Sequence, residues 1–173
     1  MIDQGIERWS EKGETELRPK RAKKNTNPFE FRASQIGQCM ARLSYSWKAP
    51  EEAASLPALH RMFSGEIWGR EIASLIMAGK SGDVRSVKQE VFLEKTFKLE
   101  KRTSIVINGH CDIVLVMKDW SKVPVEVKSM GQMSYQTLLR DGTPYDEHDA
   151  QIRTYMALLG VDKGILLVRR MDG

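Results

Sequence analysis

The apolar residues of this sequence change their spacing after Gly82, and that change restricts the fold to a class that combines helices with a sheet. Before Gly82 they recur at three- and four-residue intervals, which is typical of amphipathic helices. We predict one helix over residues 34–47 and a second over residues 56–77, in which Gly65 and Gly69 introduce a kink or a break. After Gly82 the apolar residues alternate or form short runs, which is typical of strands.

The second half of the sequence predicts strands followed by a helix and a last strand. The predicted strands cover residues 87–93, 104–108, 111–117, 123–128 and 165–168, and the predicted helix covers residues 149–159. Helices first, then strands, then a helix and a strand is the order of an α/β protein with a central mixed β-sheet flanked by helices.

Composition excludes several classes of protein. The chain has 173 residues, 41% hydrophobic and 29% charged, which suits one globular domain with a core and not a disordered or fibrous chain. No apolar run approaches the roughly 20 residues of a membrane span, so we expect no membrane contact. We expect a cytoplasmic protein with reduced cysteines, because the N-terminus lacks a basic and apolar leader and only Cys39 and Cys111 are present.

The positive charge is concentrated near the N-terminus. We interpret residues 1–27 as a basic tail and residues 28–173 as the folded domain. The net charge is +4, and five cations stand within the seven residues 18–24. Such a run is either a solvated arm or an arm that binds the phosphates of DNA. Its cations are Arg18, Lys20, Arg21, Lys23 and Lys24.

Two acids and one lysine are expected to meet on neighbouring strands. Side chains alternate along a strand, so Glu126 and Lys128 share the face opposite the valines around them. A hairpin that turns at residues 118–122 places Asp112, at the start of the first strand, beside the end of the second. Two close carboxylates repel each other, which raises a pKa or recruits a divalent cation. Their hard oxygen ligands suit Mg²⁺ or Mn²⁺, and Lys128 can orient a water molecule or neutralise a developing anion.

A helix face offers further polar groups. Gln151 and Tyr155 are four residues apart and share one face of the helix, and His148 continues that face upstream. These side chains either contact phosphates or bases of a nucleic acid, or pack as ordinary core and surface residues.

The three motifs together resemble the RecB-like branch of the PD-(D/E)XK nuclease superfamily. The resemblance rests on Gly-His-Cys-Asp ending at Asp112, Glu-Val-Lys ending at Lys128 and Gln-Ile-Arg-Thr-Tyr ending at Tyr155, and it covers about residues 32–173. That branch includes CRISPR-associated RecB-like nucleases and phage recombination exonucleases.

The resemblance implies a restriction-endonuclease-like core and metal-dependent hydrolysis of phosphodiester bonds in DNA, by an exonuclease of phage or prokaryotic recombination or repair. It implies a bacterial cell or phage-infected host, with DNA and a recombination protein as partners. Asp112 and Glu126 would be metal ligands, Lys128 would assist the attacking water, and Gln151, Tyr155 and His148 would contact the DNA. The alternatives are a catalytically impaired DNA-binding module of the same fold, and a protein-interaction domain whose acids are structural.

The first motif of the family departs from its pattern here. Gly69 stands where the family has a metal-binding histidine, and glycine cannot bind a metal. We expect Glu71, on the same helix, to supply the missing ligand. Glu66 is the second candidate, and Glu90, on the preceding strand, is the third.

The segment around Cys39 resembles the part of the family that supplies one thiolate to an iron–sulfur cluster. Such a cluster needs four thiolates, and only Cys39 matches a ligand position. We therefore expect no cluster within this chain: either this member lacks it, or the chain is a fragment without the other ligands. Cys39 is then expected to be a buried helix residue.

Overall fold

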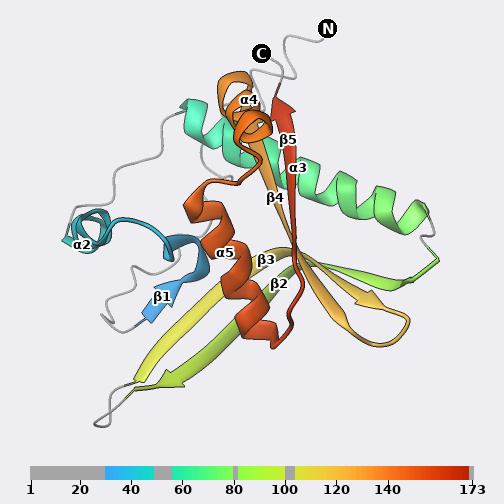
Figure 1. Ribbon diagram of the computed structural model, residues 1–173, viewed down its shortest axis with the longest axis horizontal. Helices are drawn as coiled ribbons and strands as arrows, with labels where there is room; N and C mark the ends of the chain where they lie inside the picture. Colours follow the sequence, from blue (N-terminus) through green and yellow to red (C-terminus); the bar gives the residue numbers. More distant parts are fainter. Residues whose placement is uncertain (1–29, 49–55, 80–81, 100–103, 172–173) are drawn as a thin grey trace, which may run out of the picture.

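The protein is described by a computed structural model that covers residues 30–48, 56–79, 82–99 and 104–171. Its sheet is mixed and has helices on both faces, which confirms the predicted α/β class (Figure 1). The elements in chain order are β1 (Glu30–Arg32), the short 3₁₀ turn η1 (Ala33–Gln35), α2 (Met40–Lys48), α3 (Leu56–Ala78), β2 (Val84–Lys98), β3 (Ser104–Met117), β4 (Lys122–Gly131), α4 (Gln132–Asp141), α5 (Asp146–Leu159) and β5 (Ile165–Met171).

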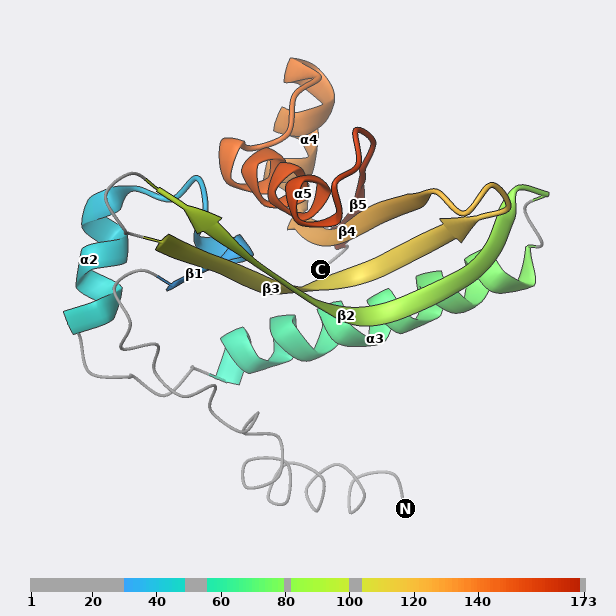
Figure 2. The same ribbon diagram turned by 90° about the horizontal axis from the view of Figure 1, so that it is seen from below.

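The sheet is the middle layer of the molecule. Figure 2 shows α3 below it and both α4 and α5 above it. β3 pairs with β2 as an antiparallel hairpin at every residue except Asp112. β4 pairs antiparallel with β3 near its start and in parallel with β5 further along. Within the described helices, none is long and apolar enough to cross a membrane.

One edge of β3 is shared by two strands that do not meet. Since β2 occupies the other edge, β1 and β4 must lie on the same side of β3. β1 pairs with residues 106–108 of β3, whereas β4 pairs with residues 113–116. Within the described chain, residues 109–112 pair with neither strand. We call this gap, where β4 leaves β3, the fork.

Helix α5 closes the gap from above. The hydroxyl of Tyr155 donates a hydrogen bond of 2.7 Å to the carbonyl oxygen of His110, which satisfies an acceptor that faces the gap. Gly109 makes this approach possible: a Cβ at that position would lie 3.0 Å from the Cβ of Ala33 and 3.2 Å from the hydroxyl of Tyr155. A side chain at Gly109 would therefore displace the helix.

The alternation of side chains is broken at the fork. Cys111 packs in the core cluster under α5, whereas Ile113, two residues later, packs in the cluster over α3. On β2 the same exchange of faces occurs between Val87 and Val91. Glu90 lies inside that interval and has a φ of +48°, a left-handed backbone that is uncommon for a residue with a side chain. Both strands of the hairpin thus exchange faces beside Asp112.

Several element boundaries differ from the sequence prediction. The first predicted helix begins only at Met40, after η1 and a short loop. α3 continues through Gly65 and Gly69, because one or two glycines cost a helix only about 1 kcal/mol each. The two strands predicted between residues 104 and 117 are the single strand β3. β1 and α4 were not predicted from the sequence.

We predict opposite effects of alanine at two glycines. Gly109→Ala places a methyl group against Ala33 and Tyr155, so it should lower the free energy of unfolding by about 1–3 kcal/mol. Gly65→Ala, inside α3 and with nothing within 4 Å, should raise it by about 0.5–1 kcal/mol. Urea denaturation of both variants measures this difference. Equal destabilisation by the two substitutions would contradict the close approach of α5 to the gap.

Candidate active site at the fork

A side chain replaces a lost backbone partner where β4 separates from β3. The ladder between the two strands ends at the pair Ile113 and Val125, so Val127 has no backbone acceptor on β3. Its N–H instead donates a 2.8 Å hydrogen bond to Oδ2 of Asp112. The carboxylate of Asp112 is held inside the fork for this reason, as the predicted hairpin requires.

Glu126 and Lys128 form an ion pair on the adjoining face of β4. The Nζ atom of Lys128 lies 2.8 Å from Oε1 of Glu126, and Glu126 is only 2% exposed. The other carboxylate oxygen of Glu126, Oε2, is buried and has no hydrogen-bond partner among the described residues. A buried acceptor without a donor is unfavourable, so this oxygen is suited to a proton or a cation.

The environment disfavours charge on both acids. Burial, more than the nearby Asp112 carboxylate, raises the pKa of Glu126 to about 7, although Lys128 acts in the opposite direction. Burial also raises the pKa of Asp112, against the hydrogen bond from Val127. Two desolvated carboxylates close together are a common feature of functional sites.

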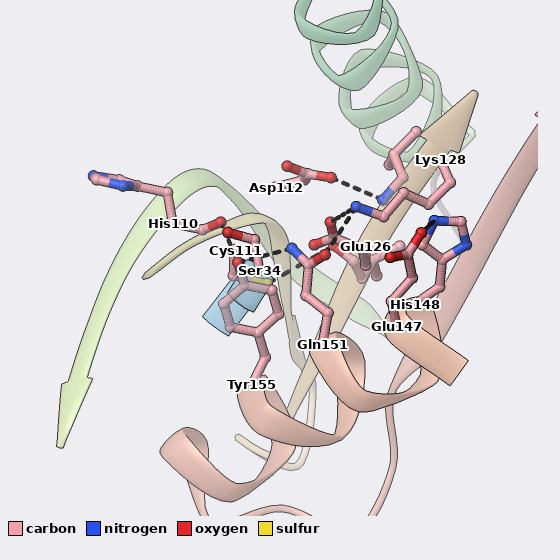
Figure 3. Close-up of polar contacts among 12 residues, drawn as sticks. Ser34, His110, Cys111, Asp112, Glu126, Lys128, Glu147, His148, Gln151 and Tyr155 are labelled. Atoms are coloured by element: carbon pink, nitrogen blue, oxygen red, sulfur yellow. Dashed lines mark hydrogen bonds and ion pairs between the residues drawn. The ribbon is translucent and has the colours of Figure 1, made fainter. Parts of the chain in front are cut away.

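A chain of hydrogen bonds connects this pair to α5. Lys128 donates to Oε1 of Gln151 at 2.9 Å, and the amide of Gln151 donates to the hydroxyl of Tyr155 at 3.3 Å (Figure 3). Tyr155 then donates to the carbonyl oxygen of His110. The predicted helix face thus does converge on the two acids and the lysine. Gln151 and Tyr155 are both buried, so within the described structure they position Lys128 and the gap edge of β3.

His148 lies beside the same lysine. Burial and the charge of Lys128 lower the pKa of His148, and its Nδ1 is buried without a partner among the described residues. Its other ring nitrogen, Nε2, lies 4.0 Å from the carboxylate of Glu147 (Figure 3). Glu147 was not among the predicted site residues. It is one of three acids in the first turn of α5, where acids are common, so its position alone is a weak indication of a functional role.

Of the two candidates for a third acid whose side chains are described, Glu71 and Glu90, Glu90 is the one whose charge acts on the pair. It stands on β2 between the positions that pair with Ile113 and Cys111, and its charge contributes to the raised pKa of Glu126. Glu71 is exposed on α3 and does not contribute to the pKa of either Asp112 or Glu126. In the described ranges, no three His, Cys, Asp or Glu side chains form a group that could hold a metal ion. The side chain of Glu66 lies outside the described residues.

The two cysteines occupy different environments, and the expectation of a buried Cys39 is wrong. Cys39 is exposed and precedes α2, where the backbone N–H groups of Arg42 and Ala41 lower its pKa. Its carbonyl accepts the hydrogen bond from Leu43 that starts the helix, as an N-cap residue does. Cys111 is buried in the core cluster under α5, and burial raises its thiol pKa to about 12.

The basic arm lies outside the described residues. This holds for Arg18, Lys20, Arg21, Lys23 and Lys24, and for the whole of the predicted tail.

The donor set at the fork fits a hard divalent cation. It offers carboxylate oxygens from Asp112 and Glu126, one of them buried without a partner among the residues that the structure describes, and the charge of Glu90 acts on the same site. Mg²⁺ and Mn²⁺ prefer oxygen ligands and retain several water molecules, so two or three carboxylates are sufficient. The ammonium group of Lys128 would be a second positive group, beside the cation, at the carboxylate of Glu126.

Comparisons with known proteins identify a shared fold but no family. No family model and no curated protein matches the sequence. Among solved structures, one described as "Crystal structure of SSO0001" matches with a TM-score of 0.61 and 18% identity, over 100% of this chain and 74% of that chain. At this identity the match shows a common arrangement of helices and strands.

We predict that the stability of the protein falls between pH 5 and pH 8 because of Glu126. An unfolded glutamate ionises near pH 4.5, whereas the folded one stays protonated up to about pH 7, so the native state binds more protons in this interval. The difference corresponds to about 3 kcal/mol in the free energy of unfolding. Glu126→Gln should remove the part of the decrease in the free energy of unfolding that comes from this carboxyl group. Urea denaturation in EDTA at several pH values measures it.

The matched control is Glu94→Gln, which changes an exposed acid on β2. It should retain the pH profile of the wild-type chain. Parallel profiles for the wild type and Glu126→Gln would contradict the buried, raised state of this carboxyl group.

Proposed function

We propose that this chain is a divalent-metal-dependent nuclease that hydrolyses phosphodiester bonds in DNA, working as an exonuclease in phage or prokaryotic recombination or repair. The observation that carries the proposal is the convergence of Asp112, Glu126 and Lys128 at the fork, where a buried oxygen of Glu126 has no hydrogen-bond partner in the described part of the chain. Two acids and an amine in this arrangement suit the binding of a cation and an anionic phosphate at one place.

Each residue has a distinct task in this proposal. Asp112 and Glu126 hold Mg²⁺ or Mn²⁺, with Glu90 as the third acid. When bound, the cation would polarise the phosphate and lower the pKa of a water molecule. Lys128 orients the attacking water and stabilises the negative charge that develops on the phosphate. Gln151 fixes the ammonium group of Lys128 through its 2.9 Å hydrogen bond, and Tyr155 fixes Gln151 in turn.

The proposal includes membership of the RecB-like branch of PD-(D/E)XK nucleases. Three motifs in the order of that branch support it, together with a mixed sheet in which the acids lie at a fork between strands. The likeness to a solved structure agrees with the fold and adds nothing on activity. We propose DNA as the partner, and we extend this to the basic arm on its charge alone.

A second candidate function is a DNA-binding module of the same fold without catalytic activity. One observation favours it: Asp112 and Glu126 have no third metal-binding side chain grouped with them in the described ranges. Gly69 stands on α3 at the position of a ligand in the nucleases that the sequence resembles, and it has no side chain to offer; a Cβ there would meet nothing within 4 Å. The two candidates differ in whether cleavage occurs, so one assay separates them.

We predict metal-dependent degradation of linear DNA that depends on Lys128. The wild-type chain should degrade labelled single- or double-stranded DNA in Mg²⁺ or Mn²⁺ and not in EDTA. Lys128→Ala should lower the rate at least about 100-fold, the usual loss for a group that stabilises transition-state charge. The matched control is Lys98→Ala, an exposed lysine at the far end of β2, which should cleave at the wild-type rate. Unchanged cleavage by Lys128→Ala would contradict the mechanism, and binding without cleavage by the wild type would favour the second candidate.

We predict further that the third acid is Glu90 and not Glu71. Glu90→Gln should weaken Mn²⁺ binding at least about tenfold, because Glu90 acts electrostatically on Glu126. Glu71→Gln should leave the affinity unchanged, because Glu71 is exposed on α3 and does not act on the acid pair. Isothermal titration of both variants with Mn²⁺ distinguishes them, and the reverse order of effects would assign the site to the helix.

A further inference from the structure

The hairpin of β3 and β4 ends in a turn that presents a tryptophan to solvent. Trp120 is 65% exposed and has a φ of +69°, a left-handed backbone that favours glycine. A large ring at such a position adds strain, and its exposure means that little burial offsets that strain. Residues held in this way are often found where a ligand binds.

The turn itself is well fixed by hydrogen bonds. The N–H of Met117 donates to the carbonyl of Ser121 at 2.9 Å, and the N–H of Trp120 donates to the carbonyl of Met117 at 3.0 Å. The carboxylate of Asp119 accepts hydrogen bonds from both the N–H and the hydroxyl of Ser121, at 2.9 and 2.6 Å. The backbone therefore holds the indole ring outward without support from a core.

Cations gather at the turn, and one of them contacts the ring. The guanidinium carbon of Arg85, on β2, lies 3.7 Å from the ring centroid, a close cation–π contact. Lys118 and Lys122 flank the turn and are exposed. Lys163, in the loop between α5 and β5, is near enough to help lower the pKa of Asp119. Two acids, Asp119 and Asp83, also lie at this turn, where the carbonyl oxygen of Asp83 accepts a hydrogen bond from the N–H of Lys118, and the four cations outnumber them.

We infer that this hairpin tip, formed by Arg85, Lys118, Trp120, Lys122 and Lys163, binds an unpaired nucleic-acid strand by stacking a base on the indole ring. Flat aromatic rings combined with cations are how proteins bind single strands without sequence preference. In a duplex the faces of the bases are covered by their neighbours, so the ring has no comparable surface to contact. The inference takes its ligand class from the proposed function.

The tip is close enough to the fork to act on the same strand. Asp112 and Met117, the last residue of β3, are five residues apart, or roughly 17 Å at about 3.3 Å per residue, and Trp120 lies beyond Met117 in the turn. A strand of a few nucleotides can therefore contact both places. The tip would select an unpaired end as the substrate of the fork.

The test is the binding of a labelled oligothymidylate to the full chain in EDTA, measured by fluorescence anisotropy. Trp120→Gly should weaken binding about tenfold, the value of one stacked base, and it also relieves the left-handed backbone. Trp120→Phe keeps a ring and should remain within about threefold of the wild type. Arg85→Gln should reduce the slope of log affinity against log salt by about 0.7, the share of one phosphate contact.

Leu139→Ala, which changes a residue 67% exposed on α4, is the control for loss of an exposed apolar side chain, and it should bind as the wild type does. Wild-type affinity of Trp120→Gly would overturn the inference. So would an equal loss by the phenylalanine variant, an equal loss for a matched duplex, or equally tight binding of polyglutamate. Because the assay contains neither metal nor cleavage, its failure is distinguishable from failure of the nuclease proposal.

Discussion

The hydrogen bond from the N–H of Val127 to the carboxylate of Asp112 is the contact on which the fork depends. β4 leaves β3 after Val125, while its other edge continues to pair with β5 as far as Gly131. This separation removes a ladder acceptor from a partly buried N–H, and a buried donor without a partner costs about 1–3 kcal/mol. Asp112 supplies the acceptor from its side chain. The residue that would hold a metal ion is therefore also the one that allows the two strands to separate.

A second set of contacts makes two neighbouring carboxylates tolerable in one place. Lys128 neutralises Glu126, Gln151 holds Lys128, and Tyr155 connects Gln151 to the unpaired edge of β3. Breaking a buried ion pair by removal of one partner is costly, since it leaves an uncompensated charge. The position of α5 over the gap is thus coupled to the charge state of the acids. Gly109 is part of the same arrangement, because any side chain there would move Tyr155.

The sequence predicts the parts of this site that follow from simple periodicity. Alternation places Glu126 and Lys128 on one face of β4, a tight hairpin brings Asp112 beside them, and helical spacing aligns Gln151 with Tyr155. It does not predict Glu147, or that Glu90 rather than Glu71 acts on the acids, because the rotation of α3 about its axis depends on packing. Trp68 of that helix contacts Arg169 of β5, while Ile72 packs against the cluster that contains Ile113. Cys39 was misjudged because its apolar spacing continues that of α2, whereas its role is to cap the helix.

The exchange of faces at Glu90 and Asp112 explains why no rule of alternation could describe the whole hairpin. A strand with strict alternation would place Cys111 and Ile113 in the same core, yet each lies in a different cluster. Asp112 stands at the boundary between the cluster under α5 and the cluster over α3. Both clusters therefore desolvate the acid pair, and this burial is the main cause of the raised pKa of Glu126. The raised pKa values at the fork are therefore a consequence of apolar packing on both faces of the sheet. The left-handed backbone of Glu90 is the local strain that accompanies the exchange of faces.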